Sequence, residues 1–134
     1  RILFYSQGAS SVSSLRIKFN GDVANYGYKS FMYYTAESTG NNSAYISLLN
    51  TPNASSTFVT IDIFNYATST TATPPKLVTW TGTTGAFSPV SNHTIFSGSG
   101  MWNNTTTTIS QIQFQVSGQT FNADSFIQVY GSSY

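Results

Sequence analysis

The stretch LRIKF (residues 15–19) shows the pattern that decides the fold class. Leu15, Ile17 and Phe19 share one side of an extended chain and the two cations share the other, because successive side chains of a β-strand point to opposite faces. The sequence NGD (residues 20–22) follows directly, and asparagine, glycine and aspartate favour turns. The stretch therefore predicts a half-buried strand that ends in a turn.

The same alternation returns in VTIDI (residues 59–63) and IQFQV (residues 112–116). Weaker strand candidates lie at residues 1–5, 26–34, 44–49, 76–81, 93–97 and 126–130, and the polar segments 10–14, 37–43, 68–75, 81–92 and 103–108 are predicted to be loops. No segment has the apolar spacing of an amphipathic helix. We therefore predict an all-β, antiparallel β-sandwich, jelly-roll-like, of roughly eight or nine strands. The predicted core comprises Leu15, Ile17, Phe19, Ile61, Ile63, Ile112, Phe114 and Val129.

Composition limits the domain count and the classes of function. The 134 residues suit a single domain over 1–134, and the aromatic fraction of 16% supplies a core. Charged residues make up 7% with a net charge of +1, so the chain lacks the basic stripe that nucleic-acid binding needs. No apolar run has the length of a membrane span. With no cysteine, the chain has no disulfide and no thiolate metal site.

The residues available for catalysis are few. There is one histidine, His93, and there are four carboxylates, Asp22, Glu37, Asp62 and Asp124. A Ser-His-Asp triad or a glycosidase acid pair can be drawn only by assuming neighbours that the sequence does not indicate. The alternative is structural, since Asp22 and Asp124 lie in turn-like clusters, Asp62 lies on the outward face of a strand and Glu37 in a polar loop. We expect no catalytic residue and no cofactor.

Two further patterns have competing interpretations. Calcium held by backbone carbonyls and one aspartate is an alternative to a metal-free domain. The glycine-rich GSG (residues 98–100) lacks the lysine and helix of a phosphate-binding loop and is predicted to be a turn.

The aromatic residues suggest a binding surface of their own. Trp80, Trp102, Tyr33 and Tyr34, with Phe31, could stack against a sugar ring, as in sandwich lectins. The alternative is that Trp102 closes one end of the core and that the tyrosines alternate with core positions, because large aromatic side chains are mostly buried.

Several phrases together resemble a family of structural domains from particles of tailed bacteriophages. They are LRIKFNGDVANYGY (15–28), VTIDIFNYA (59–67), KLV (76–78), GMWNNT (100–105) and FNADSFIQVYG (121–131). The likeness runs in the same order over essentially the whole chain. Two departures are Asp124, where the family has a small residue, and the extension at residues 132–134.

The resemblance implies a virion component without a catalytic set, most simply a capsid decoration or cement protein that stabilises the head. A homo-oligomer bound to capsid or tail proteins would follow, and a trimer would match the three-fold positions of a shell. The resemblance also implies a further strand or segment before residues 1–5. One alternative is a glycan-binding module on a tail fibre or tail tip, and another is a fragment of a secreted carbohydrate-active enzyme.

Overall fold

A computed structural model of the chain describes residues 1–12, 14–32, 35–49, 54–66, 75–85, 94–117 and 120–131. Every regular element in these segments is a β-strand, which confirms the predicted all-β class. The ten strands are β1 (Ile2–Val12), β2 (Leu15–Phe19), β3 (Tyr26–Met32), β4 (Thr35–Ser43), β5 (Ile46–Leu49), β6 (Ala54–Phe64), β7 (Lys76–Gly85), β8 (Thr94–Trp102), β9 (Ile112–Val116) and β10 (Phe126–Val129).

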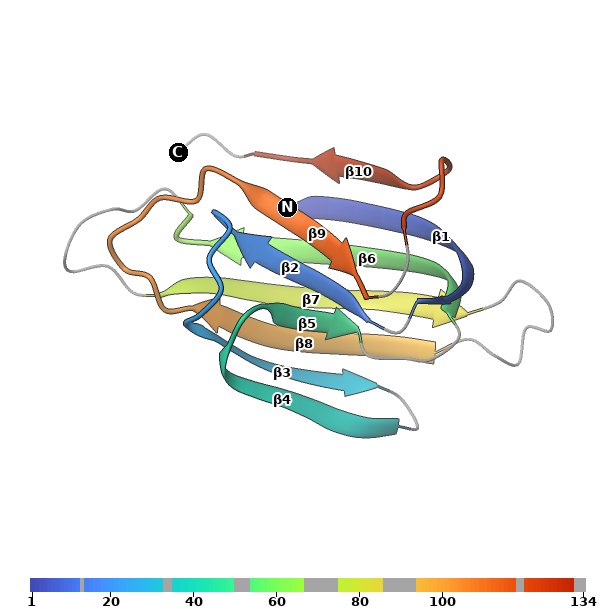
Figure 1. The fold of residues 1–134 in the computed structure, drawn as a ribbon, viewed down its shortest axis with the longest axis horizontal. Helices are drawn as coiled ribbons and strands as arrows, with labels where there is room; N and C mark the ends of the chain where they lie inside the picture. Colours follow the sequence, from blue (N-terminus) through green and yellow to red (C-terminus); the bar gives the residue numbers. More distant parts are fainter. Residues whose placement is uncertain are drawn as a thin grey trace.

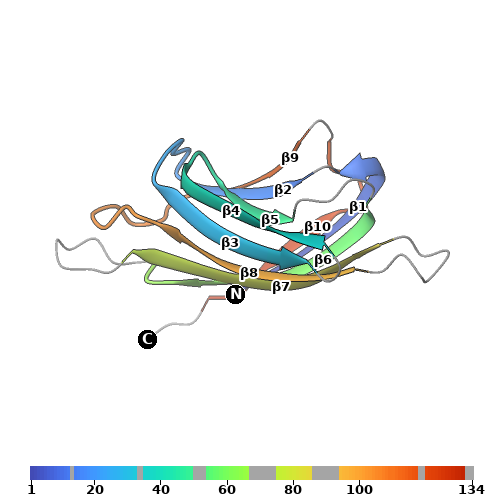
Figure 2. The same ribbon diagram turned by 90° about the horizontal axis from the view of Figure 1, so that it is seen from below.

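The strands form two antiparallel sheets that face each other as the two layers of a sandwich (Figures 1 and 2). The larger sheet has the order β10-β1-β6-β7-β8-β3-β4, and the smaller has the order β5-β2-β9. The chain passes from one layer to the other several times, because β2, β5 and β9 belong to the smaller sheet and the strands between them to the larger. The predicted antiparallel β-sandwich is thus confirmed.

Strand β2 lies at the centre of the smaller sheet, where β9 and β5 pair with it on either side. Leu15, Ile17 and Phe19 are buried and the two cations between them are half-buried, as the alternation predicts. The same period of two governs β7, whose buried and exposed residues alternate along its length. Both strands bury one face against the opposite layer, which gives a single core between the sheets.

The predicted core is correct except at one position. Leu15, Ile17, Phe19 and Ile61 are fully buried, and Ile63, Ile112 and Phe114 pack half-buried against them. Val129, in contrast, is 69% exposed, so its prediction as core is wrong. Val129 lies opposite the buried Ile2 and therefore shares the inner face, but β10 is an edge strand beyond the cover of the smaller sheet.

Several polar segments predicted as loops or turns belong to strands, and two of them only extend a neighbouring strand: residues 10–12 lie in β1 and residues 81–85 in β7. The predicted loop at residues 37–43, which includes Glu37, belongs to β4, an edge strand paired with β3. The GSG segment is not a turn but part of β8, where Gly98 lies opposite Trp80. A Cβ at Gly98 would collide with the indole ring of Trp80, so this glycine makes room for a neighbouring side chain.

Candidate functional site

The Asn20-Gly21-Asp22 turn, which is part of the phage-like phrase, fastens a distant segment to the end of β2. Asn20 and Gly21 adopt positive φ angles of 51° and 70°, which asparagine and glycine tolerate best. The side-chain Oδ1 of Asn20 accepts hydrogen bonds from the backbone N–H groups of Ser110 and Gln111, both at 2.9 Å. Its Nδ2 donates to the carbonyl oxygen of Thr108 at 2.8 Å. These bonds hold the chain that leads into β9.

The carboxylate of Asp22 serves the same turn. Its Oδ1 accepts from the backbone N–H groups of Val23 and Ala24, at 2.8 and 3.2 Å. Its Oδ2 accepts from the indole Nε1–H of Trp102 at 2.8 Å. The hydrogen bond from Trp102, followed by the backbone bonds, lowers the pKa of Asp22 from its ordinary value. Because its oxygens bind these donors, Asp22 has a structural task.

The two tryptophans of the predicted binding surface lie in the core. Trp80 is 4% exposed and donates its Nε1–H to the carbonyl oxygen of Leu48 at 2.9 Å. Trp102 is 1% exposed and packs against Phe19 and Tyr26, with ring centroids 5.7 and 6.3 Å away. The prediction that these two rings form a stacking platform is therefore wrong, because a sugar needs an accessible ring face.

The remaining members of that surface are placed differently. Tyr33 and Tyr34 lie outside the described residues, and Phe31 is half-exposed on β3. The interpretation of Trp102 as a plug at one end of the core agrees with its burial.

Lys76 is a buried cation that sequence reasoning did not single out. It opens β7 on the inward face and is fully buried. Its Nζ donates to the backbone carbonyl of Asn104 at 2.6 Å and lies 5.8 Å from the centre of the Trp102 ring. Burial lowers the pKa of Lys76 from its ordinary value. The signal that could have found it is the alternation of β7, which places residue 76 in phase with Val78 and Trp80.

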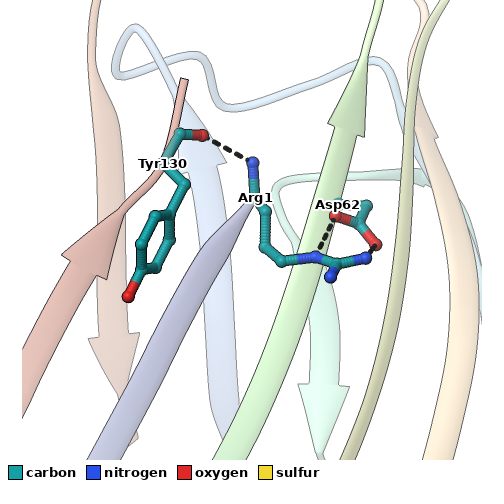
Figure 3. A network of polar contacts seen from close by, with 3 residues as sticks. All are labelled: Arg1, Asp62 and Tyr130. Carbon is teal, nitrogen blue, oxygen red and sulfur yellow. Dashed lines mark hydrogen bonds and ion pairs between the residues drawn. The ribbon is translucent and has the colours of Figure 1, made fainter. Parts of the chain in front are cut away.

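The other candidate acids are dispersed. Asp62 on β6 forms an ion pair with Arg1 at 2.9 Å (Figure 3), and the hydrogen bond from Arg1 lowers the pKa of Asp62. Asp124 lies exposed in the turn before β10. His93 lies outside the described residues. Within the described segments, no three histidine, cysteine, aspartate or glutamate side chains are grouped as a metal site requires.

A cavity of ligand size opens where β1 begins and where β6 and β10 end. We call it the end pocket; its volume is about 520 Å³, and it is lined by Arg1, Ile2, Asp62, Ile63, Phe64, Tyr66, Ile109, Ser110, Ile112, Val129, Tyr130 and Gly131. Its walls are mainly apolar. Figure 3 shows Arg1 between Asp62 and Tyr130, and Arg1 binds both: Asp62 through its guanidinium and the carbonyl oxygen of Tyr130 through its backbone nitrogen.

A larger accessible feature is the outer face, the side of the seven-stranded sheet that turns away from the smaller sheet. One row crosses five strands in register, from Phe126 through Tyr5, Phe58 and Thr83 to Ile95. Phe126, Phe58 and Ile95 are exposed, and Tyr5 stacks on Phe126 with ring centroids 5.3 Å apart.

A second apolar row lies toward the other end of the outer face and joins Phe64, Leu77 and Met101, all of them exposed. The positions between the two rows are mostly threonine and serine, such as Thr81 and Ser97. The sequence signal for these rows is that β6 and β7 carry apolar residues in both phases of the alternation. Exposed apolar groups arranged in this way are typical of surfaces that bind other macromolecules.

None of the described segments forms a helix with the length and apolar character needed to span a membrane. Comparison of the chain with protein-family models, with curated proteins and with solved structures gives no match.

Proposed function

We propose that this chain is a non-catalytic structural component of a tailed-bacteriophage particle, a capsid decoration protein that stabilises the head and acts as a homo-oligomer bound to other virion proteins. The likeness of its sequence phrases to phage structural domains supports the proposal. The structural roles of Asn20 and Asp22 support it as well, because these residues of the phrase at 15–28 form hydrogen bonds with distant parts of the fold.

The observation that carries the proposal is the outer face. Strands β6, β7 and β8 contribute exposed Phe58, Leu77, Ile95 and Met101 to it, among hydroxyl side chains. The one charged side chain that these described strands place there is Asp62, and it is paired with Arg1. A surface of this kind suits tight packing against a protein shell, since apolar contact area is gained with little charge to desolvate.

Decoration proteins reinforce a shell by repetition. Each copy adds a modest contact across the junction between shell subunits, and linked contacts bind far more tightly than any one of them alone. A surface with few charged side chains adds little long-range repulsion between neighbouring copies. The outer face and the role therefore fit each other. The tail-fibre alternative loses the two tryptophans on which it was partly based, because neither Trp80 nor Trp102 has an accessible ring face.

Copy number in the particle tests the proposal. In purified particles of the phage that encodes this chain, quantitative mass spectrometry should find many copies on each head. A handful of copies at the tail would favour the adhesion alternative, and absence from the particle would overturn the proposal.

The outer face is tested by rebinding to particles from which the protein has been stripped. Phe58→Ser combined with Ile95→Ser should weaken binding by ~10-fold or more, which corresponds to ~1.4 kcal/mol. Val23→Ser is the matched control, because Val23 is 68% exposed but lies in the turn after β2, outside the outer face. Equal binding by the double variant and the control would exclude the outer face as the docking surface.

A further inference from the structure

Strand β10 is an edge strand with apolar side chains exposed on both of its faces. Of the described strands only β1 pairs with it (Figure 1). Phe126, Ile127, Val129 and Tyr130 are exposed by 48%, 47%, 69% and 52%. The segment Phe126–Tyr130 contains no charge and no proline, which are the residues that usually protect an edge from pairing with another chain.

The backbone groups at the free edge can be assigned from the register. Arg1 and Tyr130 exchange two hydrogen bonds: the N–H of Tyr130 donates to Arg1 O at 2.7 Å, and the nitrogen of Arg1 donates to Tyr130 O at 2.8 Å. Hydrogen-bonded and non-hydrogen-bonded pairs alternate along an antiparallel ladder, so Gln128 also bonds to β1. Ile127 and Val129 therefore present their N–H and C=O groups to the open side.

The opposite edge of the same sheet is built differently. Strand β4 pairs with β3 through a register that shifts twice, between Tyr26 and Tyr28 and between Ser30 and Met32. Such irregularities twist an edge away from regular pairing. The β1–β10 ladder runs from Ile2 to Tyr5 without a shift. Of the two edges, β10 is the one that a further strand can join.

We infer that β10 pairs antiparallel with β10 of a second copy of this chain, about a two-fold axis that passes through Gln128. Opposite residues of an antiparallel pair share a face, so the axis must pass through a residue and not between two residues. With the axis at Gln128, Ile127 lies opposite Val129 of the second copy. Both apolar side chains are then covered on the inner face, and their four N–H and C=O groups meet matching partners.

The two adjacent registers also keep the faces aligned, and both fit less well. An axis at Ile127 would place Val129 opposite Ser125, whose N–H already donates to Asn122 O at 3.0 Å. An axis at Val129 would place Ile127 opposite Gly131, which has no side chain to cover it. In the Gln128 register Phe126 also lies opposite Tyr130 of the second copy, so the dimer interface has aromatic side chains on its outer face on both sides of the axis.

This pairing yields a dimer with one continuous sheet, and it does not depend on the proposed place in a virion. The trimer expected from a role at three-fold shell positions would need another interface. We expect the dimer to be reversible because the interface is short. Four residues from each copy bury far less than the roughly 1,200 Å² of total surface typical of stable complexes.

Sedimentation equilibrium of the 134-residue chain over a wide concentration range should show monomer passing to dimer. Val129→Lys should abolish the dimer, because it places a cation opposite Ile127 of the second copy. Val23→Lys is the matched control at nearly equal exposure and should dimerise like the parent. A monomer at every concentration, a trimer, or equal loss in both variants would overturn the inference.

The register is tested by cross-linking, for which the cysteine-free sequence is well suited. In the inferred pairing the two Gln128 residues form a non-hydrogen-bonded pair with Cα atoms about 4.5 Å apart, within disulfide reach. Under mild oxidation Gln128→Cys should form a covalent dimer quickly, and Ile127→Cys and Val129→Cys should form it at least ~10-fold more slowly. Equal rates for the three variants, or fastest cross-linking by either neighbour, would contradict the Gln128 axis.

Discussion

Strands β2 and β10 both place apolar side chains on their inner face, but those of β2 are buried and those of β10 are exposed. In β2 every second residue is apolar, and Leu15, Ile17 and Phe19 are fully buried. In β10, Ile127 and Val129 also fall on the inner face, yet both are exposed. The difference is the number of neighbours: β2 has a strand on each side and a sheet opposite, whereas β10 has β1 alone. The two-residue alternation determines on which face of the sheet a side chain lies. Whether that side chain is buried depends on whether other strands and the second sheet cover that face.

The largest expected effect contrasts the two strands directly. Phe19→Ala removes a fully buried ring that packs on Tyr26 and Trp102, so it should lower the free energy of unfolding by about 3–5 kcal/mol. Val129→Ala should lower it by less than about 0.5 kcal/mol, because that side chain is mostly in solvent. Urea unfolding measured at a concentration where the chain is monomeric gives both values. Similar losses in the two variants would mean that β10 is covered within a single chain.

A smaller loss of stability is expected from a substitution in the turn that ends β2. Asn20→Ala removes the acceptor for Ser110 and Gln111 and the donor to Thr108, and it puts alanine at a positive φ. The free energy of unfolding should fall by about 2–3 kcal/mol. Asn103→Ala, at an exposed asparagine, is the control and should change it little. If the two variants were equally stable, the hydrogen bonds of the Asn20 side chain would not hold the segment before β9.

The smallest effect is a dependence on pH. Because the pKa of Asp22 in the fold lies below its unfolded value of about 3.9, Asp22 contributes stability above that value. This contribution is lost as the pH falls through the lower pKa of the folded state. Asp22→Asn should therefore cost about 1 kcal/mol near pH 7 and much less near pH 2. Asp124→Asn makes the same change in an exposed turn and serves as the control. A cost for Asp22→Asn that does not change with pH would contradict this assignment.

The sequence predicts the fold well where alternation is strong. The predicted ranges of β2 and β9 match the structure because apolar and polar residues alternate in them without interruption. The strand β4 could not be predicted, since its threonine, serine, asparagine and glycine residues have a loop-like composition and its pairing with β3 depends on tertiary structure. Gly98 is a similar case, because the indole ring that requires a glycine there belongs to another strand.

The candidate surfaces were predicted less well. The two tryptophans were considered as a binding platform because of their chemistry, but each finds its hydrogen-bond partner inside the fold, at Leu48 O and Asp22 Oδ2. The outer-face residues Phe58 and Ile95 belong to strands whose sequences are apolar in both phases, and only the register shows that they meet in one row. A single sequence indicates which side chains share a face, but not which face the second layer covers.

Amide hydrogen exchange within β10 is the most direct test of whether the outer edge of this strand is unpaired in the monomer. In dilute solution the amides of Ile127 and Val129 should exchange rapidly and that of Gln128 more slowly, because of these three residues only Gln128 points its N–H toward β1. At high concentration the amides of Ile127 and Val129 should become protected as the two-fold pair forms. Protection of Ile127 and Val129 already at high dilution, equal to that of Gln128, would show that the edge is closed within one chain and would contradict the inferred two-fold pairing of β10.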